Sequence, residues 1–365
     1  MYIQSHSLNT KNSYKNGLIH FENFVAQKYQ GTFLTIVEQI KTGKLDSYKL
    51  LNEFVAYLDS KNLKPKTIKL CISAVKGYLR YVGIKIYSED FRQLVKLPKA
   101  RRYREEPLTK EIILRVLRNV TTKLQVVILM LVASGMRIGE LVQLKISDID
   151  FESKPTRIRI RAEITKTREG RETYLTEEAT KALKDYLKRF LGWNERETNP
   201  EILDKIILQA VIRKKKGNGP KTHSEAQIAQ GILRQTLLYH IAKIPELCKQ
   251  NENGSYMIHF QAFRKFFRTT VGDTVGRDFA EALMGHHFYL DTYYNLPEEK
   301  RREMYLKAEP YLTISDYAKI EKNLNKISDR QNEIEEEHQT VIRILKNSLL
   351  VPKAAEHYFM NKTQK

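Results

Sequence analysis

The chain has 365 residues, which is long for a single hydrophobic core and favours two domains. Its 63 Lys and Arg residues outnumber its 43 Asp and Glu residues, and the formal net charge of +20 favours a polyanionic partner over a merely soluble basic surface. The longest apolar run, Val126 to Ala133, is far shorter than the roughly 20 residues of a membrane span. Residues 1–12 are too polar for a signal peptide, so we expect a cytoplasmic protein with no membrane partner.

The sequence contains no pattern typical of a metal or nucleotide site. Cys71 and Cys248 lie far apart in separate apolar-periodic segments, so we expect two free thiols rather than a disulfide. No Cys/His spacing predicts zinc, and no glycine-rich loop predicts a bound nucleotide. We therefore expect no cofactor, neither a metal nor ATP.

The first part of the chain reads as a bundle of helices. Apolar residues recur at steps of three and four over residues 8–30 and 48–58, and again from Pro65 to Gly83. This periodicity predicts a helical domain over residues 1–93.

Residues 94–107 contain two prolines and few apolar residues, which predicts an interdomain linker. We interpret its basic residues as a strap along a DNA backbone, and a solvated hinge is a compatible alternative. A second basic loop lies further on and is either a phosphate contact or a solvated excursion. The candidate DNA-binding residues in these two segments are Lys99, Arg101, Arg102, Arg104, Arg213, Lys214, Lys215 and Lys216.

Residues 108–312 predict a mixed domain with a small antiparallel sheet. Thr109 is a candidate helix N-cap, and residues 125–134 are apolar nearly all round, as in a central buried helix that ends at Gly135. Basic residues alternate with isoleucine over 157–161 and the chain returns over 171–175, which predicts a hairpin with Lys166 near its tip. Further helices are expected at about 176–190, 225–249, 260–275 and 278–284. The fold class is therefore mainly α, with a small β hairpin or sheet in an α+β second domain.

Residues 313–350 keep a heptad-like apolar spacing, and residues 351–365 form a tail. The pattern favours a helix for self-association or docking. The alternative is one long helix folded back on its own domain.

Residue types suited to phosphate chemistry follow one another along the second domain. Guanidinium groups stay charged and can grip two phosphate oxygens at once. A tyrosine phenol is a weaker base than an alkoxide, so a phosphotyrosine bond stays reversible. In chain order the candidates are Arg137, Lys166, Arg264, His286 and the adjacent Tyr293 and Tyr294.

This order, with its surrounding motifs, resembles the phage-integrase family of tyrosine recombinases. The motifs are Ala-Ser-Gly-Met-Arg-Ile-Gly-Glu-Leu around Arg137, Thr-Lys-Thr around Lys166, and Leu-Met-Gly-His ending at His286. The resemblance covers about residues 8–300 and implies an N-terminal helical domain that clamps DNA opposite a catalytic domain. It also implies cutting and rejoining of double-stranded DNA through a 3′-phosphotyrosine, within a tetramer and without a cofactor.

The resemblance implies a role for each matched residue. Arg137 and Arg264 would neutralise the phosphate, Lys166 would protonate the departing 5′ oxygen, and His286 would contact the scissile phosphate. Glu140, three residues after Arg137, could orient a neighbouring base or guanidinium.

The nucleophile is chosen by its spacing from the histidine. The family's usual spacing is nine residues, so Tyr294 at eight fits better than Tyr293 at seven. Tyr289 and Tyr305 are remote alternatives.

The second box departs from the family pattern. The family usually has a histidine three residues before its second arginine, and Gln261 occupies that position here, with His259 two residues earlier. Glutamine can hydrogen-bond a phosphate oxygen, but it cannot take up or release a proton at neutral pH. Either Gln261 orients the phosphate, or Lys265 takes over the charge.

The favoured role is a site-specific integrase of a mobile element, possibly archaeal. One alternative of the same chemistry is a type IB topoisomerase that nicks and closes DNA as a monomer. The other is a DNA-binding protein that kept the fold with weak or no catalysis.

Overall fold

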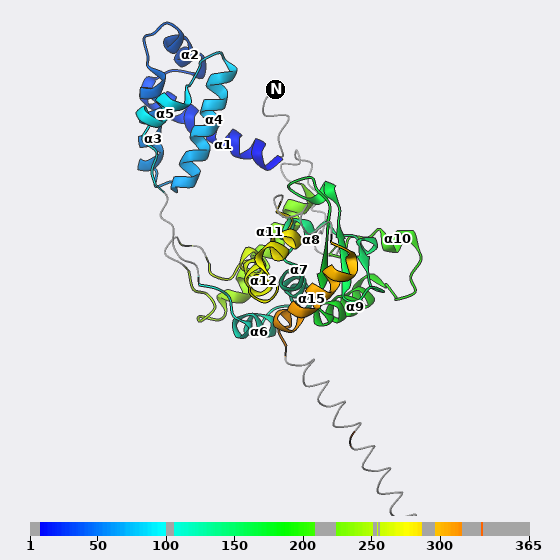
Figure 1. Ribbon diagram of the computed structural model, residues 1–365. Coiled ribbons are helices and arrows are strands. Elements are labelled where there is room, and N and C mark those ends of the chain that lie inside the picture. Colours follow the sequence, from blue (N-terminus) through cyan, green and yellow to red (C-terminus); the bar gives the residue numbers. More distant parts are fainter. Residues whose placement is uncertain are drawn as a thin grey trace, which may run out of the picture. The chain divides into compact units, whose positions relative to one another are not determined.

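The computed structural model describes residues 8–99, 106–208, 224–250, 254, 256–286, 296–315 and 330 (Figure 1). The chain divides into two compact units. The N-terminal unit runs to Glu105 and the C-terminal unit begins at Glu106. The expected class, mainly helical with a small antiparallel sheet, is confirmed. None of the helices described is both long and apolar enough to cross a membrane.

The N-terminal unit is all helical. Its helices are α1 (Leu8–Tyr29), α2 (Phe33–Lys41), α3 (Ser47–Ser60), α4 (Pro65–Tyr81) and α5 (Ser88–Leu94). The three helices that the periodicity predicts correspond to α1, α3 and α4, whereas α2 and α5 were not predicted. The core is aromatic at its centre, because the Phe54 ring lies 5.0 Å from the Phe21 ring and 5.3 Å from the Phe24 ring between centroids.

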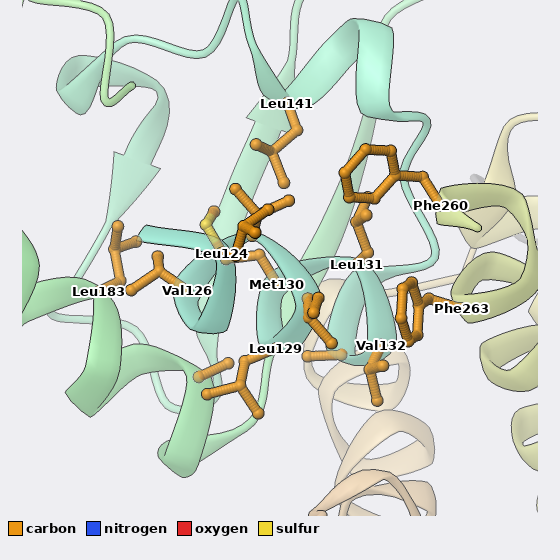
Figure 2. Close-up of a cluster of buried hydrophobic side chains, with 14 of the residues drawn as sticks. Leu124, Val126, Leu129, Met130, Leu131, Val132, Leu141, Leu183, Phe260 and Phe263 are labelled. Carbon is orange, nitrogen blue, oxygen red and sulfur yellow. The ribbon is translucent and has the colours of Figure 1, made fainter. Parts of the chain in front are cut away.

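The C-terminal unit is organised around α7 (Thr122–Ser134), whose residues Val126 to Ser134 are all buried. Figure 2 shows how apolar side chains surround this helix, with Leu183 of α9 (Glu177–Leu191) and Phe260 and Phe263 of α12 (Phe260–Thr274) among them. Gly135 ends α7 in the left-handed conformation, with φ of +61°. A Cβ at Gly135 would lie 2.2 Å from the Phe267 ring, so this helix end fits tightly against α12.

The sheet has three antiparallel strands in the order β1 (Ile149–Asp150), β2 (Thr156–Ile160) and β3 (Arg171–Leu175). The predicted hairpin is confirmed as β2 and β3, while the two-residue β1 was not predicted. Ile160 is buried and pairs with Arg171 across the hairpin, so Arg171 faces the core as well. Residues 161–170 join the two strands and include a short 3-10 helix, η3 (Ala162–Ile164).

The remaining elements complete the C-terminal unit. They are α6 (Lys110–Arg118), α8 (Ile138–Leu141), the 3-10 helix η2 (Ile146–Asp148), α10 (Pro200–Leu203), α11 (Glu225–Ala242), α13 (Arg277–Met284) and α15 (Glu298–Leu312). Thr109 caps α6 as expected, because its side chain accepts from the backbone N–H of Ile112. The helix expected over 225–249 is wrong in length. It ends at Ala242, since Ile244 precedes Pro245 and such a residue disfavours helical backbone.

Two further expectations concern the cysteines and the C-terminal segment. Cys71 and Cys248 are both free thiols, as predicted. The heptad-like segment 313–350 and the tail 351–365 lie outside the described residues, except for residues 313–315 and 330.

Candidate active site

Arg137 lies immediately beyond the buried helix α7, where it is the N-cap residue of α8. Its backbone N–H donates to Glu140 Oε2 at 2.8 Å, and its guanidinium Nη1 donates to Glu140 Oε1 at 2.9 Å. The Glu140 carboxylate thus fixes both the backbone and the side chain of Arg137. The Arg137 side chain remains 27% exposed, so part of its guanidinium is available to a ligand.

A second arginine holds the same carboxylate from within the core. Arg171 donates from Nη1 to Glu140 Oε1 at 3.1 Å and from Nη2 to Oε2 at 2.6 Å. Its Nε donates to the backbone carbonyl of Leu283 at 2.9 Å, which connects the sheet to α13. Burial acts to raise the pKa of Glu140, but the hydrogen bonds and charges of Arg171 and Arg137 outweigh it and lower the pKa below its usual value. Glu140 is therefore an ionised carboxylate in the interior.

Arg264, on the first turns of α12, is 2% exposed. Its Nη1 donates to the carbonyl of Gly135 and its Nη2 donates to the carbonyl of Met284 at 2.8 Å. Burial and, after it, the charge of Arg137 lower the pKa of Arg264 to about 9, so the guanidinium is still charged at neutral pH. This side chain links α12 to the end of α7 and to the end of α13.

His286 follows α13 directly. Gly285 ends that helix in the left-handed conformation, with φ of +74°, and the His286 backbone N–H donates to the Glu281 carbonyl at 3.1 Å. The His286 ring contacts the Glu281 carboxylate through Nδ1, and the other carboxylate oxygen accepts from Arg268 Nε. The His286 side chain is 40% exposed and Glu281 is buried.

The structure therefore brings Arg137, Arg264 and His286 together. Arg264 binds the carbonyl of Gly135, two residues before Arg137, and the carbonyl of Met284, two residues before His286. The cluster combines cationic and imidazole side chains, which suits the binding of an oxyanion such as a phosphate diester. In the described part of the chain, no group of three or more His, Cys, Asp or Glu residues could hold a metal ion.

Three other predicted site residues, Lys166, Gln261 and Lys265, are exposed. Lys166 is exposed in the connection between β2 and β3. Gln261 and Lys265 are exposed on α12, and Gln261 lies three residues before Arg264, on a neighbouring face of the helix. His259 caps α12 instead, because its Nδ1 accepts from the Ala262 backbone N–H at 3.1 Å.

Several predicted residues lie outside the described part of the chain. Among the linker candidates, Lys99 is described, and it is exposed. Those outside are Arg101, Arg102, Arg104, Arg213, Lys214, Lys215, Lys216, Tyr289, Tyr293 and Tyr294. Tyr305 is described and fully buried, and its hydroxyl donates to the Ala133 carbonyl at 2.8 Å. This burial removes Tyr305 from the candidate nucleophiles.

Sequence reasoning missed Arg171, Glu281 and Arg268 as parts of this network. One signal could have found Arg171: the hairpin register pairs it with a core isoleucine, which predicts an inward-facing guanidinium that needs a buried partner. No comparable signal marks Glu281, because its contact with His286 depends on the left-handed turn at Gly285.

A helical unit followed by an α+β unit with a cationic cluster defines the structural class of the chain. Within this class the chain belongs to the phage integrase family. Residues 106–287 match the phage integrase family itself, and residues 2–83 match the N-terminal SAM-like domain of phage integrases. The resemblance inferred from the motifs is confirmed.

Individual relatives are similar over part of their length. The chain is 32% identical over 101 residues to a tyrosine recombinase XerA of Pyrococcus furiosus, covering 27% of this chain and 34% of the relative. It is 30% identical over 132 residues to a tyrosine recombinase XerA of Saccharolobus solfataricus, covering 36% and 42%. The chain thus matches well under half the length of these curated relatives.

Solved structures with a similar fold include a recombinase bound to DNA. It is the XerH site-specific recombinase bound to its difH substrate in a pre-cleavage complex, with a TM-score of 0.50 and 18% sequence identity. The match covers 80% of this chain and 77% of that chain.

Proposed function

We propose that the protein is a site-specific recombinase that cuts and rejoins double-stranded DNA through a 3′-phosphotyrosine intermediate. One observation carries the proposal: Arg264 donates to the carbonyls of Gly135 and Met284, which ties together the backbone segments that lead to Arg137 and His286. Membership of the phage integrase family and the net charge of +20 support it.

Each residue of the site has a role in this proposal. The guanidinium groups of Arg137 and Arg264 neutralise the non-bridging oxygens of the scissile phosphate, and His286 hydrogen-bonds one of them. Gln261 orients the phosphate from α12, with Lys265 as the alternative charge. Glu140 acts through Arg137 and does not touch the DNA.

Tyr294 is the proposed nucleophile. Its phenol gives up its proton to solvent water and the oxygen attacks phosphorus, the bond from phosphorus to the 5′ oxygen breaks, and Lys166 protonates the leaving oxygen. The phosphotyrosine conserves the energy of the broken bond, so religation needs no ATP. No step of the proposed chemistry requires a metal ion.

The proposal extends to the way the DNA is held. The N-terminal unit clamps the duplex, and basic residues such as Lys99 contact its backbone. Four protomers exchange strands in the cytoplasm on one DNA assembly, and the biological role is integration of a mobile element. Membership of the phage integrase family and the net charge of the chain support these proposals.

The test uses nicked duplexes in which cleavage releases a short oligonucleotide and traps the protein on DNA. A library of such duplexes with a randomised core is incubated with the protein in EDTA, and the trapped DNA ends are sequenced. We expect a covalent adduct with the wild type and with Tyr293→Phe, and none with Tyr294→Phe.

Each other result has a distinct meaning. Loss of the adduct in Tyr293→Phe alone would move the nucleophile to Tyr293. DNA binding without any adduct would leave a binding protein of the same fold. Relaxation of plasmids that lack the trapped sequence, by a monomer, would indicate a nicking-closing enzyme.

A further inference from the structure

We propose that Glu281 is a positioning residue for His286, and that it fixes which ring nitrogen faces the phosphate. This inference rests on the proposed function, because it assigns a partner to a residue of that site. Glu281 has no place among the residues that the motifs single out. It is nevertheless one of the few ionisable side chains buried in the described interior.

The backbone makes the contact possible. Gly285 adopts φ of +74°, which turns the chain back so that His286 lies beside Glu281 rather than continuing along α13. A Cβ at Gly285 would lie 2.7 Å from Cδ of Arg171, so the buried guanidinium leaves no room for a larger residue there. The turn is thus held from two sides, by the carbonyl of Glu281 and by Arg171.

The chemistry of the two side chains determines the orientation of the ring. An ionised carboxylate only accepts hydrogen bonds, so Nδ1 of His286 must carry the hydrogen that it shares with Glu281. Nε2 is then the ring nitrogen that points away from Glu281 and is available to a ligand. A histidine held in this way by a carboxylate has one defined tautomer and one defined ring orientation.

Arg268 completes the arrangement. Its Nε binds the other oxygen of Glu281, so both carboxylate oxygens are engaged and the carboxylate plane is fixed. The Arg268 side chain is 53% exposed, whereas the Glu281 side chain is buried. The carboxylate that accepts from the His286 ring is therefore a buried one. In the alternative explanation, Glu281 serves only the fold, through the contact with Arg268 that joins α12 to α13. The two readings predict different couplings to His286.

The experiment is a double-mutant cycle on the trapped DNA substrate. Single-turnover adduct formation is measured for the wild type, Glu281→Ala, Glu281→Gln, His286→Ala and the Glu281→Ala/His286→Ala variant, with DNA affinity measured separately by mobility shift. Asp278→Ala is the matched control, because Asp278 is an exposed carboxylate on the same helix. Thermal unfolding is recorded for each variant.

We expect Glu281→Ala to slow adduct formation on the order of 10- to 100-fold at unchanged DNA affinity, the size of effect found for residues that orient metal-binding histidines. In the His286→Ala background the same change should cost nothing further. Glu281→Gln should fall between, since an amide can also donate to Nδ1 and no longer fixes the tautomer. Asp278→Ala should match the wild type.

Equal losses in both backgrounds would overturn the proposal and leave a structural Glu281–Arg268 pair. ¹⁵N NMR of the imidazole gives a second reading that needs no DNA. The wild type should show the hydrogen on Nδ1, and a hydrogen on Nε2 in the neutral ring would also overturn the proposal. If the wild type forms no adduct, the proposed function fails, while the NMR result still decides whether Glu281 orients His286.

Discussion

The two units of the molecule bury different kinds of side chain. The core of the N-terminal unit is apolar and aromatic, with Phe21, Phe24 and Phe54 at its centre. In the described residues, the buried polar and charged side chains all belong to the C-terminal unit. They are Ser134, Glu140, Asp148, Thr156, Thr165, Arg171, Thr173, Thr176, Arg264 and Glu281.

This difference separates what folds the chain from what the chain does. Apolar burial alone stabilises a helical unit, at about 25 cal/mol per Å² of apolar surface removed from water. Buried charges lose their hydration, and a buried ion pair is often no better for stability than apolar residues of the same size. Stability therefore does not explain why Glu140, Arg171, Arg264 and Glu281 lie inside, whereas the proposed phosphate site does.

The largest expected effect comes from removing one partner of the buried pair. Arg171→Met leaves Glu140 in the interior with Arg137 as its remaining ion-pair partner, and should lower the free energy of unfolding of the C-terminal unit by about 3–5 kcal/mol. Trp193, the single tryptophan of the chain, is buried in this unit. Its fluorescence during urea denaturation measures the change.

A double variant then tests whether the pair serves stability or the site. Glu140→Gln/Arg171→Met removes both charges and should recover much of the lost stability, yet it should not recover adduct formation on DNA. A double variant as unstable as Arg171→Met would contradict this separation. Full activity in the double variant would show that the site does not need the Glu140–Arg171 pair.

The pH dependence of stability sharpens the same comparison. The pKa of Glu140 is lowered in the folded protein, because Arg171 and Arg137 outweigh the effect of burial. A lowered folded-state pKa contributes stability above the unfolded value of about 4.3, and this contribution is lost as the pH falls through the folded pKa. The Trp193 transition of the wild type should therefore weaken more steeply on acidification below this value than that of Glu140→Gln/Arg171→Met. Parallel curves for the two proteins would show that the Glu140 carboxylate contributes no acid-dependent stability.

A smaller effect is expected in the apolar core of the N-terminal unit. Phe54→Leu keeps an apolar side chain but loses the ring contacts with Phe21 and Phe24, which should cost about 1–2 kcal/mol. Amide hydrogen exchange should become faster in α1, α3 and α4, while the Trp193 transition stays unchanged. A shift of the Trp193 midpoint would show that the two units do not unfold separately.

The sequence predicted the elements whose pattern is local and long. α1, α3, α4 and α7 have enough turns for their apolar spacing to be read, and Gly135 marks the end of α7. The short elements α2, α5 and β1 were missed because nine, seven and two residues hold too few repeats of a period. The capping threonine of α2, Thr32, was the available signal.

The site was predictable only where a motif carries it. Arg137, Arg264 and His286 follow from motifs within single segments, and the structure places them together. Arg171 is 31 residues from Glu140, so their pairing depends on the hairpin register and on the packing of β3 against α7. Glu281 depends on a backbone reversal that a helical pattern does not contain.

The smallest expected effect concerns Tyr305, a polar group buried within the C-terminal unit. Tyr305→Phe removes the hydroxyl that donates to the Ala133 carbonyl and keeps the ring, whose centroid lies 5.2 Å from that of Tyr174. The loss should be about 1 kcal/mol in the Trp193 transition, because one buried hydrogen bond is lost without a change of packing. Adduct formation should persist in this variant, because the Tyr305 hydroxyl is buried and donates to the Ala133 carbonyl, so it stabilises the fold and does not reach the DNA. Abolition of the adduct with the Trp193 transition intact would instead make Tyr305 part of the chemistry, and would mean that this buried phenol leaves the interior when DNA binds.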